Sequence, residues 1–153
     1  MRRVTKSEVL KAVSNYGPIR LVGLSDEPTL YRMILPQRGD VYVKCGADIL
    51  LNGLKTDLRA EARCPVCGNV TSFHIDQRRI EDLDPKEPML HVVEFKMGPR
   101  HLGVECESTH IFDKKDCLTK WVSTYAGKHG LVISLPEYMS SLNQRLPRKV
   151  SPA

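Results

Sequence analysis

The chain has 153 residues, 41% of them hydrophobic, which is enough for one globular domain with a substantial core. Its net charge of +5 comes from basic residues scattered among acidic ones, and only 6% of residues are aromatic, so a nucleic-acid-binding surface is not expected. There is no apolar run of about 18 residues, and no basic N-terminal stretch followed by an apolar segment and a cleavage site. We therefore expect a cytoplasmic protein that makes no use of a membrane.

The first part of the sequence predicts a helix and then a hairpin. Thr5 and Glu8 form a capping-box pattern for a helix over residues 5–16, so residues 1–30 are expected to be a helical and linker segment. The main domain is expected over residues 31–147, followed by a frayed tail of residues 148–153. Residues 31–35 and 41–44 flank the turn-rich PQRGD and predict two strands, the second of which runs into Cys45.

A helix is predicted directly after Cys45. Its apolar residues recur at the helical period of i, i+3, i+4 and i+7, and they are Ala47, Leu50, Leu51 and Leu54. Cys45, Asp48 and Asn52 fall on the opposite face. At about 100° per residue, Cys45 and Asp48 lie within roughly 60° of each other, so their side chains are expected to share one small site.

The rest of the chain predicts further strands and two helices. Strands are expected over residues 57–63 and 69–75, joined by CPVCG, and over residues 89–95 and 102–112, with a helical turn and loop over residues 78–88. Alternation in the last of these strands places Cys106 inward, as a candidate partner for Cys45. A helix around Leu118 to Tyr125, a strand at LVISL and a helix over 136–146 complete an α+β domain, a small mixed or antiparallel sheet with packed helices.

The five cysteines make thiol or metal chemistry the leading question. Five is an odd number and no secretion signal is expected, so the thiols should be reduced rather than paired in disulfides. A thiol at a helix start has a lowered pKa, which suits Cys45 to act as a nucleophile or soft-metal ligand. The alternative is that Cys45 is a small buried hydrophobe and Asp48 only a favourable helix-start carboxylate.

Residues 31 to 146 resemble the alkylmercury (organomercurial) lyases. The resemblance is carried by VYVKCGAD, by the second cysteine in VECESTHIF, and by the ending WVSTYAGKHGLVISLPEYMSSLNQRL. It implies the fold of that family and a reaction in which two thiolates weaken a carbon–mercury bond and an aspartate protonates the leaving carbon. The residues that match the reacting groups are Cys45, Cys106 and Asp48.

The resemblance also implies partners. The expected substrate is an organomercurial or other organometal compound, the expected recipient of the product is a thiol acceptor or a mercuric-reductase-like protein, and catalysis is expected to need no cofactor. The alternative is a protein that binds or delivers a soft metal ion (Hg, Cu or Zn) through the same thiols without breaking a bond. A carrier of that kind has no need of a proton shuttle at Asp48.

Cys64 and Cys67 have the spacing of half a zinc site. A structural Zn²⁺ there would need further ligands, for which the sequence offers His74, His91, His101 and His110. The alternatives are a thiol pair that passes metal onward, a plain turn, and a nucleic-acid-associated zinc knuckle. Cys117 is expected to be structural, and His110 to be a core histidine.

Overall fold

The computed structural model describes residues 20–36, 39–98, 101–125 and 130–147. The helix expected over residues 5–16 and the tail of residues 148–153 lie outside this part of the chain. The described helical elements are α2 (Gly46–Gly53), α3 (Lys115–Thr124), α4 (Leu135–Arg145) and the 3₁₀ turn η1 (Cys106–Ser108). The described strands are β1 (Leu24–Ser25), β2 (Tyr31–Leu35), β3 (Gly39–Val43), β4 (Leu58–Arg63), β5 (Val70–Asp76), β6 (Arg79–Asp84), β7 (Met89–Val92), β8 (Glu94–Gly98), β9 (His101–Val104), β10 (His110–Phe112) and β11 (Leu131–Ser134).

The strands form three antiparallel sheets, so the fold is α+β as the sequence predicted. The largest sheet has the order β1-β3-β2-β4-β5-β6, a second has the order β10-β7-β11, and β8 pairs with β9 alone. The predicted hairpin is present as β2 and β3, with Tyr31 opposite Val43 and Leu35 opposite Gly39. In β2, Tyr31, Met33 and Leu35 are buried, which is the alternation of a strand with one face on the core.

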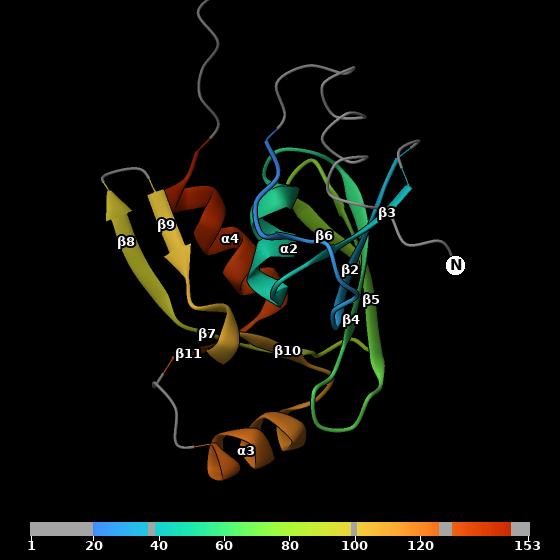
Figure 1. The fold of residues 1–153 in the computed structure, drawn as a ribbon, viewed down its shortest axis with the longest axis vertical. Coiled ribbons are helices and arrows are strands. Elements are labelled where there is room, and N and C mark those ends of the chain that lie inside the picture. Colours follow the sequence, from blue (N-terminus) through green and yellow to red (C-terminus); the bar gives the residue numbers. More distant parts are fainter. Residues whose placement is uncertain (1–19, 37–38, 99–100, 126–129, 148–153) are drawn as a thin grey trace, which may run out of the picture.

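Helices α2 and α4 lie on one side of the six-stranded sheet, between it and the β8–β9 hairpin, whereas α3 lies apart from them, beyond β7 and β10 (Figure 1). The main contacts of α2 are with β2 to β5 and with β10, and those of α3 are with β7 and β10 alone. No helix of the described residues is long and apolar enough to cross a membrane. The arrangement puts α2 deep in the molecule and α3 at its edge.

The two faces predicted for α2 are both buried. Asp48 is only 6% exposed, and Ile49 and Asn52 are 0% exposed, although the sequence pattern placed Asp48 and Asn52 on a polar face. Leu51, from the predicted apolar stripe, is only half-buried. The reason is tertiary, since the helix is enclosed by the large sheet on one side and β10 on another.

Three other predicted elements differ from the structure. Residues 78–88 were expected to form a helical turn and loop, but Arg79–Asp84 is the edge strand β6, paired with β5 through a bulge. The strand expected over residues 89–95 is divided into β7 and β8, which belong to different sheets. The strand expected over residues 102–112 is divided into β9, η1 and β10, so Cys106 lies on a turn.

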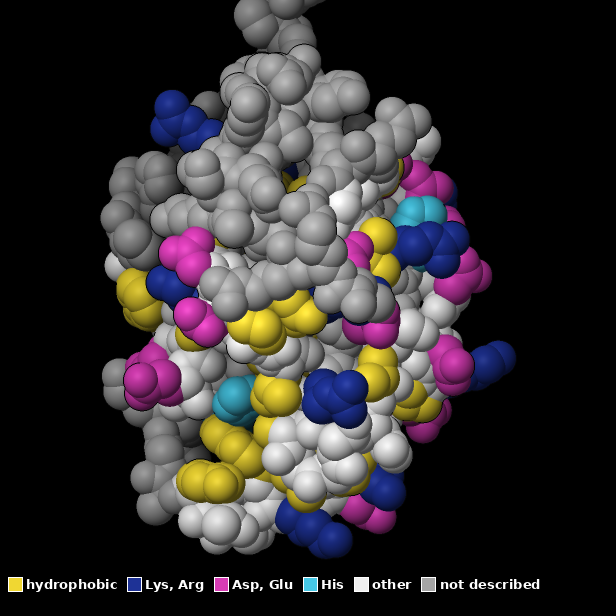
Figure 2. Space-filling model, turned by 45° about the vertical axis from the view of Figure 1, so that its right-hand side comes forward, with side chains coloured by type: hydrophobic (Ala, Val, Ile, Leu, Met, Phe, Trp, Pro, Cys, Tyr) yellow, Lys and Arg dark blue, Asp and Glu magenta, His cyan; other side chains and the backbone are white. Residues whose placement is uncertain are grey.

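Charges of both signs are interspersed on the face drawn in Figure 2. Among the described side chains, Lys and Arg lie between Asp and Glu side chains and hydrophobic ones, without forming a continuous basic stripe. This distribution fits the scattered basic residues of the sequence.

Candidate active site

Cys45 joins β3 to α2. Val41 and Val43 of β3 are buried, and Cys45 continues their alternation with an extended backbone (φ −151°, ψ 168°) and a side chain that is 0% exposed. It is therefore the N-cap residue of the helix rather than part of its first turn. The strand aims the thiol into the core, and the helix begins immediately after it.

Asp48 is the third residue of α2, close to the positive end of the helix dipole. Its backbone N–H donates to the carbonyl oxygen of Cys45 over 3.1 Å, which closes the first turn. One carboxylate oxygen, Oδ2, accepts from the Cys45 thiol at 3.5 Å and from the Cys106 thiol at 3.6 Å. Both thiols thus contact the same oxygen atom.

Cys106 reaches this carboxylate from the η1 turn and is half-exposed. Each of Cys45, Asp48 and Cys106 offers one ligand atom, and these three atoms lie within 4.8 Å of one another. Gly46 permits the approach, because a Cβ atom there would lie only 2.5 Å from Cγ1 of Ile111, in the strand that follows the turn. The sequence placed these three residues together for a partly wrong reason, since no strand carries Cys106.

The three groups have shifted pKa values. The pKa of Cys45 is raised by its hydrogen bond with Cys106 and by burial, whereas the pKa of Cys106 is lowered, chiefly by that same hydrogen bond. Burial raises the pKa of Asp48 and outweighs the hydrogen bonds from the two thiols, which lower it. Lys44 also lowers the pKa values of Asp48 and Cys106 by its charge. The accessible thiol is therefore the one that ionises first.

A short segment before β1 closes over Asp48. The Asn52 side chain exchanges two hydrogen bonds with the backbone of Val22, at 2.7 and 3.0 Å, and the Lys44 N–H donates to the carbonyl of Gly23 over 2.8 Å. Gly23 has φ +68°, and a Cβ atom there would overlap the Asp48 carboxylate. Gly23 and Asn52 thus position the carboxylate, a role that no sequence pattern predicted for either residue.

Two histidines hold the turn that carries Cys106. Nδ1 of His91 donates to the carbonyl of Ser108 at 2.6 Å, which leaves Nε2 to accept from the Gly130 N–H at 3.1 Å. Nε2 of His110 donates to the carbonyl of Glu107 at 3.1 Å, and its Nδ1 accepts from the Tyr31 hydroxyl at 2.7 Å. Burial lowers the pKa of His110, which favours this neutral form.

Trp121 of α3 packs between these histidines. Its ring centroid lies 5.1 Å from that of His91 and 5.4 Å from that of His110. The prediction that His110 is a core histidine is consistent with this setting, in which both ring nitrogens are engaged by protein atoms. Trp121 of α3 therefore contacts both histidines that hold the Cys106 turn.

Cys64 and Cys67 belong to a second cluster, on the other side of β10 from α2. Their partners are Asp113 and Cys117, and the four ligand atoms lie within 4.8 Å of one another. The sequence offered histidines as possible further ligands, but none of His74, His91 and His110 takes part, and the side chain of His101 lies outside what the structure describes. Cys117, expected to be only structural, is a member of this cluster.

A cavity of about 730 Å³ lies away from both thiols of the first cluster. The residues that line it come from the connection before β7 and from the starts of α3 and α4, including Lys86, Met89, Lys114 and Pro136. None of Cys45, Asp48 and Cys106 is among its lining residues. Cys106 is half-exposed whereas Cys45 and Asp48 are buried, so Cys106 is the member of the first cluster that a ligand can reach from solvent.

Comparisons with known proteins bear on the fold and the family of the chain. The crystal structure of the mercury-bound form of MerB2 matches with a TM-score of 0.64 and 21% sequence identity, over 82% of this chain and 62% of that one, so the chain spans less than two thirds of its length. At this identity the match shows a shared fold. No curated protein sequence matches significantly. The family model for alkylmercury lyase matches residues 24–146, most of the chain, and the protein therefore belongs to the alkylmercury lyase family.

Proposed function

We propose that this protein cleaves carbon–mercury bonds by protonolysis at Cys45, Asp48 and Cys106. The observation that carries the proposal is the single carboxylate oxygen, Oδ2 of Asp48, that contacts both thiols, at 3.5 and 3.6 Å. Mercury(II) is a soft ion that prefers thiolate sulfur, so two adjacent thiols suit it as ligands. A carboxylate between them supplies what bond cleavage needs in addition, which is a group that moves a proton.

Cys106 binds the organomercurial first. It is half-exposed and its pKa is lowered, so it offers a thiolate to an incoming R–Hg⁺ group, whereas Cys45 is fully buried and its pKa is raised. Lys44, the exposed residue before Cys45, adds a positive charge that favours the Cys106 thiolate. The Cys106 sulfur therefore forms the first S–Hg bond.

The proton for the carbon comes from Cys45 by way of Asp48. As mercury approaches Cys45, its thiol gives its proton to the Asp48 carboxylate, which already accepts its hydrogen bond. The raised pKa of Asp48 makes the carboxyl group a suitable proton carrier, because it can accept from a thiol and then donate to carbon. Cys45 forms the second S–Hg bond, the C–Hg bond breaks, and the carbon takes the proton from Asp48.

The atoms and charges of these steps are accounted for in the products. One hydrocarbon R–H leaves, Hg²⁺ stays on the two thiolates, and Asp48 returns to its carboxylate form. A thiol acceptor, small or protein-bound, then removes Hg²⁺ by ligand exchange at the half-exposed Cys106. The cycle as proposed uses no cofactor, and reduced thiols throughout fit a cytoplasmic setting.

The test separates cleavage from binding. Purified protein is incubated without oxygen with methylmercury or phenylmercury, and the methane or benzene released is measured by gas chromatography against a control with free thiol alone. Asp48→Asn should lower hydrocarbon release by about 10²-fold or more while Hg²⁺ binding persists, because both thiols remain. Cys45→Ser and Cys106→Ser should reduce release and binding together.

Asp116→Asn is the matched control for Asp48→Asn. Asp116 also lies in the first turn of a helix, but it is exposed and belongs to α3, so its replacement should leave hydrocarbon release unchanged. Full turnover by Asp48→Asn would reject the mechanism and make Asp48 only a helix-start carboxylate. Wild-type protein that binds Hg²⁺ but releases no hydrocarbon above the thiol control would instead support the carrier alternative.

A further inference from the structure

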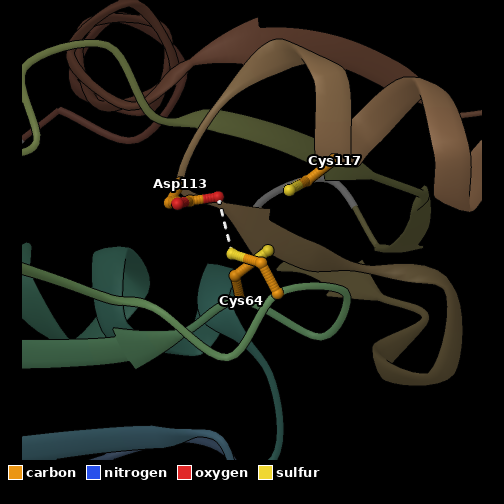
Figure 3. A group of neighbouring side chains, drawn as sticks. Cys64, Asp113 and Cys117 are labelled. Atoms are coloured by element: carbon orange, nitrogen blue, oxygen red, sulfur yellow. Dashed lines mark hydrogen bonds between the residues drawn. The ribbon is translucent and has the colours of Figure 1, made fainter.

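The second cluster brings together four ligands from two distant parts of the chain. Cys64 follows β4 and Cys67 lies in the β4–β5 turn, whereas Asp113 follows β10 and Cys117 lies in the first turn of α3. Figure 3 shows Asp113 and Cys117, at the start of α3, directed toward Cys64 at the end of β4. Three thiol sulfurs and a carboxylate oxygen within 4.8 Å of one another have the number and spacing of a four-coordinate metal site.

The backbone around these residues is already shaped for such a site. In the β4–β5 turn the Gly68 N–H donates to the carbonyl of Cys64 over 3.0 Å, so the turn is closed and both of its thiols are presented together. The Asp113 carboxylate is held at both oxygens, with Oδ1 3.2 Å from the Cys67 sulfur and Oδ2 3.1 Å from the Asn69 amide nitrogen. An outer hydrogen bond that orients a carboxylate ligand is a common companion of metal binding.

Burial of the ligands also suits a structural metal. Cys64, Asp113 and Cys117 are 2%, 7% and 3% exposed, so three of the four possible ligands are shielded from water. The guanidinium of Arg63, the residue before Cys64, donates to the carbonyl of Gly68 over 2.8 Å. A divalent ion at the centre would satisfy all four groups.

The packing of α3 also supports a metal site. Only two of its residues, Cys117 and Leu118, are buried, and with Cys64 and Phe112 they form a small cluster separate from the main core. Val122 of this helix and Tyr125, its C-cap residue, are 41% and 59% exposed. Trp121 and Met89 add partly buried contacts to this small cluster, and a metal ion that links α3 to the large sheet would add further to the free energy that holds the helix there.

We propose that Cys64, Cys67, Asp113 and Cys117 bind one structural Zn²⁺ that fastens the start of α3 to the β4–β5 turn. Thiolate-rich four-ligand sets select Zn²⁺ over the hard ions Mg²⁺ and Ca²⁺, which prefer oxygen. All four positions are filled by protein, which is the arrangement of a structural rather than a catalytic zinc. The site is distinct from the one proposed for mercury and shares no residue with it.

The first test measures metal content and stability. Protein purified with Zn²⁺ present and then dialysed should hold about one zinc per chain by mass spectrometry, and chelation should lower its melting temperature. Cys117→Ser and Asp113→Asn should each bind zinc at least about tenfold more weakly in competition with a chelator dye. Cys45→Ser, which removes a thiol from the other cluster, should retain the same zinc content and affinity.

Cobalt substitution identifies the ligands without any assay of activity. Co²⁺ in this site should show the visible bands of tetrahedral coordination and an ultraviolet thiolate-to-cobalt band, and Asp113→Cys should keep the metal while strengthening the ultraviolet band through a fourth thiolate. Asp113→Cys also serves if Cys117→Ser fails to fold. The proposal would be overturned if the purified protein held no metal and its melting temperature did not change on addition of a chelator. Loss of zinc in Cys45→Ser with zinc retained in Cys117→Ser would overturn it as well.

Discussion

The two cysteine clusters use the same kinds of side chain but hold their carboxylates differently. Asp48 offers one oxygen to two thiols, and among the described residues its side-chain partners are those thiols. Asp113 has one oxygen near a thiol and the other fixed by the Asn69 amide. A carboxylate held by thiols can exchange protons with them, whereas one held by an amide donor is kept ionised as a ligand.

The pKa directions follow from this difference. Burial raises the pKa of Asp48, and its hydrogen bonds do not reverse the effect. Burial also acts to raise the pKa of Asp113, but hydrogen bonds from Cys67 and Asn69 lower it below its ordinary value. Similar residues are thus suited by their neighbours to proton transfer in one cluster and to metal binding in the other.

The largest expected effect comes from the residue that places Asp48. Gly23→Ala introduces a methyl group that overlaps the carboxylate, so Oδ2 must move away from both thiols. Displacing a reacting group by about 1 Å can cost about 10²-fold in rate, and we expect a loss of that size in hydrocarbon release with Hg²⁺ binding kept.

Gly68→Ala is the matched control for Gly23→Ala. Gly68 also has a positive φ, of 80°, but nothing lies within 4 Å of the position its Cβ would take. The variant therefore carries the backbone strain, roughly 1 kcal/mol, without the collision. If both variants lose the same activity, strain rather than displacement of Asp48 is the cause.

The next largest effect tests the orientation of Asp113. Asn69→Ala removes the amide that fixes its Oδ2 and should weaken Zn²⁺ binding by about 10- to 100-fold, the usual range for an outer hydrogen bond to a ligand. Asn143→Ala is the control. The Asn143 amide is on α4 and donates to the carbonyl of Arg78, so its loss should leave zinc affinity unchanged. Chelator competition measures both. Equal affinities for Asn69→Ala and wild type would make Asn69 irrelevant to the metal.

The comparison also shows what the sequence could and could not predict. Cys45 and Asp48 are three residues apart at a helix start, so the helical period alone brings them together, and CPVCG predicts a turn with two thiols in the same way. Cys106, Asp113 and Cys117 come from far along the chain, and their places depend on how β10 packs between α2 and α3. No local period encodes that packing.

The errors have physical causes of the same kind. The strand expected over residues 102–112 is interrupted because Thr109 bonds to the carbonyl of Glu105 at 2.8 Å and to the N–H of Val93, which turns the chain at η1. Gly23 gave no signal, because its importance lies in a collision with a residue 25 positions away along the chain. One available signal was missed: Asp113 and Cys117 are four residues apart where a helix begins, and so can face one site.

A smaller effect should appear in thiol reactivity. In zinc-loaded protein at pH 7, a short pulse of iodoacetamide should label Cys106 at least about tenfold faster than Cys45, because Cys106 is half-exposed with a lowered pKa and Cys45 is buried with a raised one. Peptide mass spectrometry gives the site of each label. Cys67 is exposed, yet bound zinc should protect it until a chelator is added. Rapid labelling of Cys67 with zinc present would contradict the ligand assignment.

The smallest effect tests whether the two regions are coupled through His110, which holds the Cys106 turn and packs on Trp121 of the helix that carries Cys117. Burial lowers the pKa of His110, so the unfolded chain binds a proton at this residue more readily than the folded protein does. The neutral His110 therefore contributes stability above the ordinary histidine pKa of about 6.5, and this contribution is lost as the pH falls below this value. The melting temperature should therefore fall between about pH 7.5 and 5.5, and His110→Gln should reduce that fall by about 3 °C or less. If His110→Gln reduces the pH dependence and also speeds the loss of zinc to a chelator, the imidazole transmits strain between the turn and α3. If the pH dependence changes alone, the two clusters are independent sites that share one fold.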